Sequence, residues 1–286
     1  MLTDTDADTA HINTHSTPQT LLIKYGGNAM TDPAAQSAIM AAIAQLHQAG
    51  HRIVLVHGGG PFIKANLERA QIAAEFIGGH RVTTTEAMEE VQQALRGKVN
   101  GDLVKAARQH DLPAVGISGK DGQLALAKKR HFVDPETGQP ADLGFVGDII
   151  AMDPTLIRTL WHTNYLPIVS PVTMGADGED YNINADMFAG HLAGALGVHQ
   201  YWVLTDIDGL RQDKDDPDTL ITQLEVGAIP RLEGTVIQGG MIPKVESCQI
   251  ALREGAKACR ILNGRQPELL AQCLDTQTAI GTLIHN

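Results

Sequence analysis

Two lysines stand at positions in the sequence where a free positive charge is costly. Lys24 ends a short apolar run just before a glycine pair, and a charge in a buried strand is unfavourable unless it is compensated. Lys244 follows a proline at a predicted helix start, where a cation opposes the helix dipole. Lys24 could instead extend to water from the strand end, and Lys244 alone is ambiguous. Together the two lysines favour a site for a bound anion.

Three glycine clusters follow predicted strands or loops: Gly26-Gly27, Gly58-Gly59-Gly60 and Gly239-Gly240. In open α/β sheets, ligands bind beyond the carboxyl ends of the strands, and glycine lets backbone N–H groups approach phosphate or carboxylate oxygens. A tight turn explains any one cluster equally well, but three around one sheet favour an anion cradle. The chain has neither a G-x-x-x-x-G-K-[ST] loop nor a G-x-G-x-x-G fingerprint, which argues against an NAD-dependent oxidoreductase.

Amide and carboxylate side chains alternate in a third candidate segment, at Asn182, Asn184 and Asp186. Asn184 can cap a helix, with Asp186 in its first turn, so helix capping alone explains these two residues. Capping leaves Asn182 without a role, which makes it a candidate ligand-binding residue.

The candidate residues require a scaffold of strands and helices. Apolar runs predict strands at 21–24, 53–56, 114–117, 166–169, 202–204, 261–262 and 282–284. Helices are predicted from Asp32-Pro33, over 84–110 with Thr83 and Glu86 as a capping box, over 184–196 and over 243–254. The stretch 124–150 is predicted to form hairpins on the edge of the sheet. The fold class is therefore α/β, a three-layer αβα sandwich with a central, mostly parallel sheet.

The order of these segments predicts one continuous fold with two functional lobes. Residues 1–20 are interpreted as a disordered lead-in that resembles neither a signal nor a transit peptide. Residues 21–175 would form an N-terminal lobe for substrate binding and dimerisation, and residues 176–286 a C-terminal lobe for the nucleotide.

The composition of the chain limits the classes of partner that it could bind. The 286-residue chain carries a formal net charge of −11, which argues against a nucleic-acid backbone or an anionic membrane as its main partner. No apolar run approaches the roughly 18 residues that span a bilayer. The three cysteines lack metal-ligand or C-x-x-C spacing, so we expect reduced thiols in a cytoplasmic protein.

A series of motifs resembles the acetylglutamate kinases of the amino acid kinase family, over nearly all of residues 21–286. The motifs occur in the family's order: Lys24-x-Gly-Gly, His57-Gly-Gly-Gly-Pro, Gly79-His80-Arg81-Val82-Thr83, Gly97-Lys98-Val99-Asn100, Ser118-Gly119-Lys120-Asp121-Gly122, Leu143-Gly144-Phe145-Val146-Gly147, Asn182 to Asp186, Leu204-Thr205-Asp206-x-x-Gly209 and Gly239-Gly240-Met241-x-x-Lys244.

The resemblance implies a role for each candidate residue. Lys24 and Lys244 would flank the transferring phosphoryl group, and Asp186 would hold both lysines. N-acetyl-L-glutamate would be bound by Gly59, Gly60, Arg81, Asn182 and Asn184, with Arg81 on the α-carboxylate. ATP would be bound by Gly26, Gly27, Thr205, Asp206, Asp208, Gly209, Leu210, Arg211, Val236, Ile237, Gln238 and Gly239. Mg²⁺ would be held mainly by the ATP phosphates, without protein ligands of its own.

The chemistry agrees with this assignment. A γ-carboxylate with a pKa near 4.3 is already ionised at neutral pH, so phosphoryl transfer to it needs no general base. Two lysines and Mg²⁺ can offset the charge on the transferred group, and an arginine can hold a carboxylate through two parallel hydrogen bonds. The sequence thus predicts an arginine-biosynthesis enzyme that converts N-acetylglutamate to an acyl phosphate.

Two departures from the family pattern bear on regulation and on the pocket. The family usually has leucine where this chain has His80. Arginine-inhibited hexameric members share a C-terminal pattern of which this chain keeps only the final Gly281-Thr282, and the lead-in lacks an apolar stripe. We therefore predict a homodimer, rather than a hexamer, that L-arginine does not inhibit.

Two other functions remain open. Arg81 and Asn182 would also suit a related acidic substrate, such as carrier-bound aminoadipate or glutamate. The chain could alternatively be a catalytically idle ligand sensor of the same fold, although a sensor would have no need of both lysines and Asp186.

Overall fold

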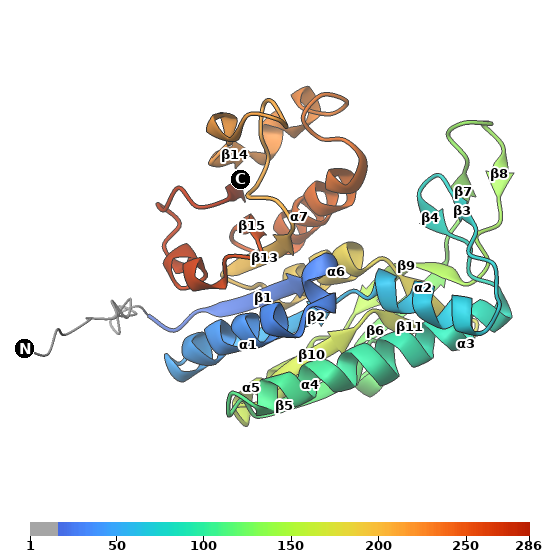
Figure 1. Ribbon diagram of the computed structural model, residues 1–286, viewed down its shortest axis with the longest axis horizontal. Helices are drawn as coiled ribbons and strands as arrows, with labels where there is room; N and C mark the ends of the chain where they lie inside the picture. The colour runs from blue at the N-terminus through green and yellow to red at the C-terminus, as the bar shows by residue number, and fades with distance from the viewer. Residues whose placement is uncertain (1–16) are drawn as a thin grey trace, which may run out of the picture.

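The computed structural model describes residues 17–286, apart from the side chains of residues 28 and 29 (Figure 1). Most of the predicted lead-in, residues 1–16, lies outside the described residues. Thr20 already belongs to the first strand, where its N–H and hydroxyl group contact His199, so the ordered fold begins one residue earlier than predicted.

An eight-stranded sheet forms the centre of the molecule, in the order β14-β16-β15-β13-β1-β2-β10-β5. Every pair in it is parallel except β15 with β16, so the predicted mostly parallel sheet is confirmed. Its strands are β1 (Thr20–Tyr25), β2 (Arg52–His57), β5 (Ala114–Ser118), β10 (Leu166–Ser170), β13 (Gln200–Thr205), β14 (Gln223–Glu225), β15 (Cys259–Asn263) and β16 (Thr282–His285).

Helices cover both faces of this sheet (Figure 1). They are α1 (Pro33–Gln48), α2 (Gly60–Arg69), α3 (Thr85–Gln92), the π-helix η2 (Gln93–Val99), α4 (Asn100–Arg108), α5 (Thr155–His162), α6 (Ala185–Leu196) and α7 (Ile242–Glu254). Alternate residues of the central strands belong to two different cores: Leu22 packs with α5 to α7, whereas Leu21 and Ile23 pack with α1 and α4. The three-layer αβα sandwich is therefore confirmed.

Helix starts follow the predicted chemistry with one exception. The Asp32 side chain accepts a hydrogen bond from Ala34 N ahead of α1, as expected for Asp32-Pro33. At α3 the cap is Thr84, whose hydroxyl group accepts from Ala87 N, so the predicted Thr83–Glu86 capping box is wrong. Thr83 is instead buried and pairs with the Gly144 region, which removes it from the helix end.

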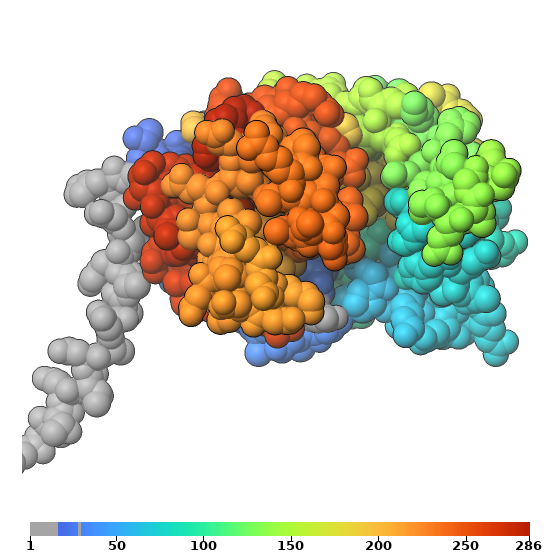
Figure 2. All heavy atoms as spheres, turned by 90° about the horizontal axis from the view of Figure 1, so that it is seen from above, coloured from blue at the N-terminus to red at the C-terminus, as the bar shows by residue number. Residues whose placement is uncertain are grey.

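The stretch after β5 departs from the prediction. Instead of lying on the edge of the main sheet, β6 (Ala125–Lys129) and β9 (Val146–Met152) close a small barrel with β11 (Val172–Gly175) and β12 (Asp180–Ile183). Closure pairs strand edges that would otherwise be exposed. Two hairpins, β3–β4 (Phe76–Ile77, His80–Arg81) and β7–β8 (Phe132–Val133, Pro140–Ala141), lie side by side beyond the barrel (Figures 1 and 2).

Short 3-10 helices complete the chain: η1 (Asn28–Thr31), η3 (Asp121–Gln123), η4 (Pro217–Thr219), η5 (Val226–Arg231), η6 (Gly239–Met241), η7 (Pro267–Leu269) and η8 (Gln272–Leu274). The main sheet continues across residue 175, so the division into lobes at 21–175 and 176–286 stays a prediction. Within residues 17–286, no helix combines the length and the apolarity that a bilayer span requires.

Candidate functional site

Three charged side chains meet at the carboxyl end of β1. Lys24 Nζ lies 2.9 Å from Asp186 Oδ1, and Lys244 Nζ lies 3.3 Å from Asp186 Oδ2. Lys24 is 5% exposed and Asp186 is 6% exposed, so the ion pairs are shielded from water. Two ammonium groups against one carboxylate leave a net charge of +1, which suits a bound anion.

The elements that hold this triad follow from local sequence. Asn184 Oδ1 accepts hydrogen bonds from Asp186 N (2.8 Å) and Met187 N (3.2 Å), so the predicted cap starts α6 and fixes Asp186 in its first turn. Close packing of α6 on α7 then brings Lys244 within reach. A Cβ at Gly190 would lie 2.5 Å from Ser247 O, so glycine is required for this approach.

The electrostatics of the triad favour its charged form. Burial opposes ionisation of Asp186, but the positive charges of Lys24 and Lys244 outweigh it and hold the pKa of this carboxyl below its usual value. Burial and the neighbouring Lys24 lower the pKa of Lys244, while Asp186 counteracts them. Asp186 therefore keeps two nearby cations in place that would otherwise repel each other.

The first glycine pair lies directly against the triad. A Cβ at Gly26 would lie 2.5 Å from Lys24 Nζ. Gly27 has φ +81°, in the left-handed region, and its Cβ position would lie 3.0 Å from Asp206 Oδ1. The structure thus brings Lys24, Asp186, Lys244, the glycine pair and Asp206 together. At Gly60, Gly239 and Gly240 an added Cβ would meet nothing within 4 Å, which is consistent with open space beside these residues.

Arg81 lies on a separate element, the β3–β4 hairpin. Its guanidinium carbon lies 4.6 Å from the centroid of the Phe76 ring on the paired strand, a cation–π contact. Arg81 Nη1 is buried and has no hydrogen-bond partner, and burial lowers the pKa of this side chain. A buried guanidinium N–H group without a partner is costly, and a ligand carboxylate would satisfy it.

Residues 143–147 link Arg81 to Asn182, and only family resemblance pointed to this segment. Phe145 N donates to Thr83 O (2.7 Å), and Asn182 N donates to Phe145 O (2.9 Å). Gly144 has φ +67°, and a Cβ there would lie 2.1 Å from Thr83 O. Residues 143–147 therefore hold the hairpin end and β12 at a fixed spacing. The glycine at position 144 was the only local signal of this contact, because so close a backbone approach leaves no room for a side chain.

Among the residues predicted to bind the nucleotide, some have polar side chains that hydrogen-bond one another and others are buried apolar residues. Asp208 accepts from Arg211 Nη2 and from Asn263 Nδ2, both at 2.7 Å, so these side chains hold one another. Leu210 and Ile237 are buried, and Leu210 N donates to Thr282 Oγ1 (2.8 Å). Asp208 lines a cavity of about 230 Å³ and Ile237 one of about 430 Å³. Thr205 ends β13 and Gly209 lies in the loop after it, whereas Val236 and Gln238 precede η6 and Gly239 begins it.

Metal-ligating chemistry is sparse in the part of the chain that the structure describes. Residues 17–286 contain no group of three or more His, Cys, Asp or Glu side chains arranged to hold a metal ion. Both oxygens of Asp186 are used by lysines. Cys248, Cys259 and Cys273 are free and buried.

A buried lysine–carboxylate–lysine triad at the carboxyl end of a parallel strand suits a ligand that carries phosphate groups. The sequence profile of the amino acid kinase family matches residues 19–263. The chain therefore belongs to the amino acid kinase family.

Within this family the chain is similar to acetylglutamate kinases. It is 42% identical to that of Moorella thermoacetica, over 93% of this chain and 91% of the relative. It is 45% identical to that of Sphingopyxis alaskensis, over 93% of this chain and 89% of the relative. Solved structures with the same fold include Giardia carbamate kinase, with a TM-score of 0.71 and 20% identity over 94% of this chain and 99% of that one.

Proposed function

We propose that this chain is an acetylglutamate kinase, which transfers the γ-phosphoryl group of ATP to the γ-carboxylate of N-acetyl-L-glutamate in arginine biosynthesis. The observation that carries this proposal is the buried carboxylate of Asp186 between the ammonium groups of Lys24 and Lys244. The similarity to acetylglutamate kinases over 93% of the chain supports the choice of substrate.

In the proposed reaction an oxygen of the γ-carboxylate attacks the γ-phosphorus, the bond to the β-phosphate oxygen breaks, and ADP leaves. The products are an acyl phosphate and ADP, and no proton has to be removed from the nucleophile. Lys24 and Lys244 stabilise the charge on the transferred group, and Asp186 positions them. Fixed charges of this kind act most strongly in a site from which water is excluded.

The acyl amino acid binds between the glycine loop and the hairpin in this proposal. Gly59 and Gly60 offer backbone N–H groups, and Arg81 receives the α-carboxylate on its buried, unpartnered Nη1. Asn182 contacts the acetamido group, and Asn184 contributes chiefly as the cap that fixes Asp186. In the space-filling view the surface is hollowed between the orange C-terminal segments and the cyan and green segments that contain the hairpins (Figure 2).

The nucleotide occupies the C-terminal side of this hollow. Gly26, Gly27 and Gly239 approach the phosphates, and the loops 205–211 and 236–239 surround the nucleoside. Mg²⁺ is bound by the ATP phosphates rather than by Asp186, whose oxygens are engaged, and it supplies additional neutralisation of phosphate charge.

The proposal extends to the assembly and the compartment. We propose a homodimer that L-arginine does not inhibit, because the C-terminal segment before Thr282 lacks the pattern of arginine-inhibited hexamers. A cytoplasmic location is supported by the three buried free cysteines, since reducing compartments keep thiols unpaired. Light scattering that gives a hexamer would contradict the proposed homodimer, and inhibition at millimolar L-arginine would contradict the proposed lack of inhibition.

The decisive experiment traps the product. Purified protein is incubated with ATP, Mg²⁺ and N-acetylglutamate in the presence of hydroxylamine, which converts an acyl phosphate to a hydroxamate. We expect hydroxamate and ADP in equal amounts, and neither product without N-acetylglutamate. Activity with glutamate or aminoadipate on a carrier protein, and none with free N-acetylglutamate, would show that the substrate is the carrier-bound amino acid. Tight binding without turnover would indicate a sensor.

A further inference from the structure

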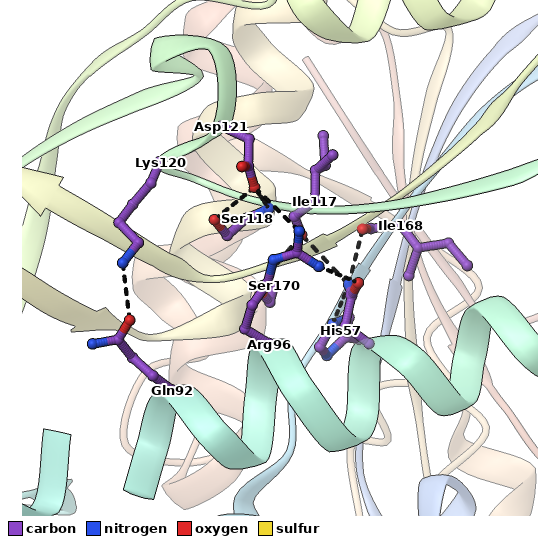
Figure 3. A network of polar contacts seen from close by, with 10 residues as sticks. His57, Gln92, Arg96, Ile117, Ser118, Lys120, Asp121, Ile168 and Ser170 are labelled. Atoms are coloured by element: carbon purple, nitrogen blue, oxygen red, sulfur yellow. Dashed lines mark hydrogen bonds and ion pairs between the residues drawn. The ribbon is translucent and has the colours of Figure 1, made fainter. Parts of the chain in front are cut away.

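A line of polar side chains, of which Asn100 is buried, Gln92 half-buried and Arg96 exposed, runs along the helix formed by α3, η2 and α4. Gln92, Arg96 and Asn100 are spaced four residues apart, and Gln92 and Arg96 point from this helix toward the segment that carries Lys120 and Asp121 (Figure 3). The middle of the line lies in the π-helix η2, a geometry that is rare and frequent at functional sites. None of the three residues belongs to the triad or to the predicted nucleotide loops.

Asn100 is the most buried member of this line, at 1% exposure. Its Nδ2 donates to His57 Nε2 on β2 (3.0 Å) and to Ile168 O on β10 (2.9 Å), and its Oδ1 accepts from Arg96 Nη1 (3.2 Å). A Cβ at Gly116 on β5 would lie 2.1 Å from Asn100 Oδ1, so glycine leaves the room for this amide. Asn100 thus contacts three neighbouring strands, β2 at its last residue and β10 and β5 near their middle.

His57 is fully buried, and both ring nitrogens have partners. Nε2 accepts from Asn100, so Nδ1 carries the proton and donates to Gly58 O (2.9 Å). Burial, together with the positive charge of Arg96, lowers the pKa of His57 to about 4 although the Gly58 contact opposes this. Tyr25, the residue in register on β1, is kept neutral because burial raises its pKa. The imidazole is therefore neutral and held in one tautomer.

The contact from His57 reaches the glycine loop that begins at Gly58. Gly58 N donates to Tyr25 O (3.0 Å), so the loop is fixed to β1 on one side. A Cβ at Gly59 would lie 2.5 Å from Leu95 Cδ2, so the same helix also supports Gly59 by packing. The orientation of the Gly59 and Gly60 N–H groups depends on both contacts.

The other end of the line reaches the strand that carries Asn182. Gln92 Nε2 and Lys120 Nζ both contact Asp180 Oδ2 at 2.9 Å, at the first residue of β12. Between the two ends, Arg96 Nη2 lies 3.7 Å from Asp121 Oδ2, which also accepts from Ser118 N and Oγ (Figure 3). One helix face therefore contacts both arms of the proposed substrate pocket.

From this geometry we propose that Asn100 is a positioning residue of the acyl-amino-acid site. It holds neutral His57 in the Nδ1–H tautomer, and the His57–Gly58 hydrogen bond holds the Gly58–Gly60 loop in the conformation that receives the substrate. The inference rests on the proposed function, because it names the residue that orders one of that site's binding loops.

The variant Asn100→Asp tests this arrangement, since it replaces the donor to His57 Nε2 with an acceptor of nearly equal size. The carboxylate favours a proton on Nε2 and thereby raises the pKa of His57. We expect KM for N-acetylglutamate to rise about tenfold at pH 8, with KM for ATP within about twofold of wild type. KM for N-acetylglutamate should also change more steeply with pH between 6 and 8 in the variant than in wild type.

The matched control is Asn66→Asp, because Asn66 Nδ2 likewise donates to a carbonyl, Glu90 O (3.3 Å), but its side-chain partners, Glu90 and Arg69, lie outside the glycine loop. Its KM values should equal those of wild type. An unchanged KM for N-acetylglutamate in folded Asn100→Asp, or an equal rise in both KM values, would overturn the inference. Wild-type protein without activity on N-acetylglutamate would instead refute the proposed function, so the two failures are distinguishable.

A measurement on the unsubstituted protein covers the case in which Asn100→Asp does not fold. In ¹⁵N-histidine-labelled wild type, the signals absent from His57→Gln identify His57. We expect protonated Nδ1, unprotonated Nε2, no titration between pH 5.5 and 9, and a shift on addition of N-acetylglutamate but not of an unreactive ATP analogue. Protonation of Nε2 in this range, or no response to N-acetylglutamate, would reject the proposal.

Discussion

The two ends of the proposed site are built on different principles. At the phosphoryl end, Lys24, Asp186 and Lys244 come from a central strand and two packed helices, and their charges compensate one another. At the carboxylate end, Arg81 lies on a two-residue strand of a hairpin, half-buried, with Nη1 unpartnered. At the phosphoryl end the carboxylate of Asp186 is paired with both lysines before any ligand arrives, whereas the guanidinium group of Arg81 has a buried N–H group without a hydrogen-bond partner.

This difference separates catalysis from recognition. Charges that stabilise a transition state must be oriented in advance, because reorganising them during the reaction would raise the barrier. A recognition group can tolerate an unfavourable free state, since the cost is recovered when the substrate binds. Substitutions at the first end should therefore lower kcat, and substitutions at the second should raise KM for the acyl amino acid.

The largest effect is expected for Lys244→Ala. Loss of one of two cations at the transferred group should lower kcat by about 100- to 1,000-fold, with KM for N-acetylglutamate nearly unchanged. Steady-state kinetics with the hydroxamate assay measures this. The control Lys98→Ala removes a more exposed lysine, paired with Asp102 on the next helical turn, and should keep full activity. A loss of less than tenfold for Lys244→Ala would contradict the catalytic half of the comparison.

Arg81→Ala should affect mainly KM for N-acetylglutamate rather than kcat. Removing the guanidinium that receives the α-carboxylate should raise KM for N-acetylglutamate by about 100-fold, while kcat at saturation falls by less than about tenfold. The exposed Arg108 on α4 provides the control, since Arg108→Ala removes an equal charge far from the hairpin in sequence. Equal losses in kcat for Arg81→Ala and Lys244→Ala would show that the two ends are not separable.

The variant Gly144→Ala tests whether residues 143–147 hold the end of the β3–β4 hairpin in place. The new methyl group would lie 2.1 Å from Thr83 O at a backbone with φ +67°, so Thr83 and the hairpin end must shift. We expect KM for N-acetylglutamate to rise about tenfold, and the free energy of unfolding to fall by about 1–3 kcal/mol. Gly138→Ala is a matched control, because Gly138 also has φ +67° but an added Cβ there would meet nothing within 4 Å. It should lose stability without a change in KM, and equal KM values in both variants would show that residues 143–147 do not hold the hairpin in place.

The phosphoryl end was largely predictable from the sequence. Lys24, Asn184 and Lys244 each follow local rules, because a strand end, a helix cap and a helix start depend on a few neighbouring residues. The pairing of Asp186 with both lysines came from family resemblance, because local sequence does not show that α6 and α7 pack side by side. The capping prediction at Thr83 also used local rules. It was wrong because Thr83 pairs with Gly144, a residue distant in the sequence.

The carboxylate end was predicted only in part. Arg81 came from family resemblance, and no periodicity indicated that Phe76 lies under its guanidinium group. The closed barrel that carries Asn182 joins strands far apart in the chain, and hydrophobic alternation does not specify which strands pair. The contact between Asn100 and His57 spans 43 residues, so local propensity contains no trace of it.

The smallest effect concerns His80, which stands where the family usually has leucine and packs edge-on against Phe132 with ring centroids 4.8 Å apart. Burial and the charge of Arg130 lower the pKa of His80, although Asp148 opposes them. The folded state then binds fewer protons than the unfolded state, so this contact contributes stability above pH 6.5 that is lost as the pH falls toward the lowered pKa.

Protonated His80 should loosen the packing between the two hairpins. KM for N-acetylglutamate should therefore rise about two- to threefold between pH 8 and pH 6 in wild type, and His80→Leu should flatten this profile. His57 does not interfere, because its pKa of about 4 keeps it neutral throughout. The exposed His162 on α5 supplies the control, and His162→Leu should keep the wild-type profile. Identical profiles for wild type and His80→Leu would mean that the carboxylate end, like the phosphoryl end, is insensitive to pH in this range.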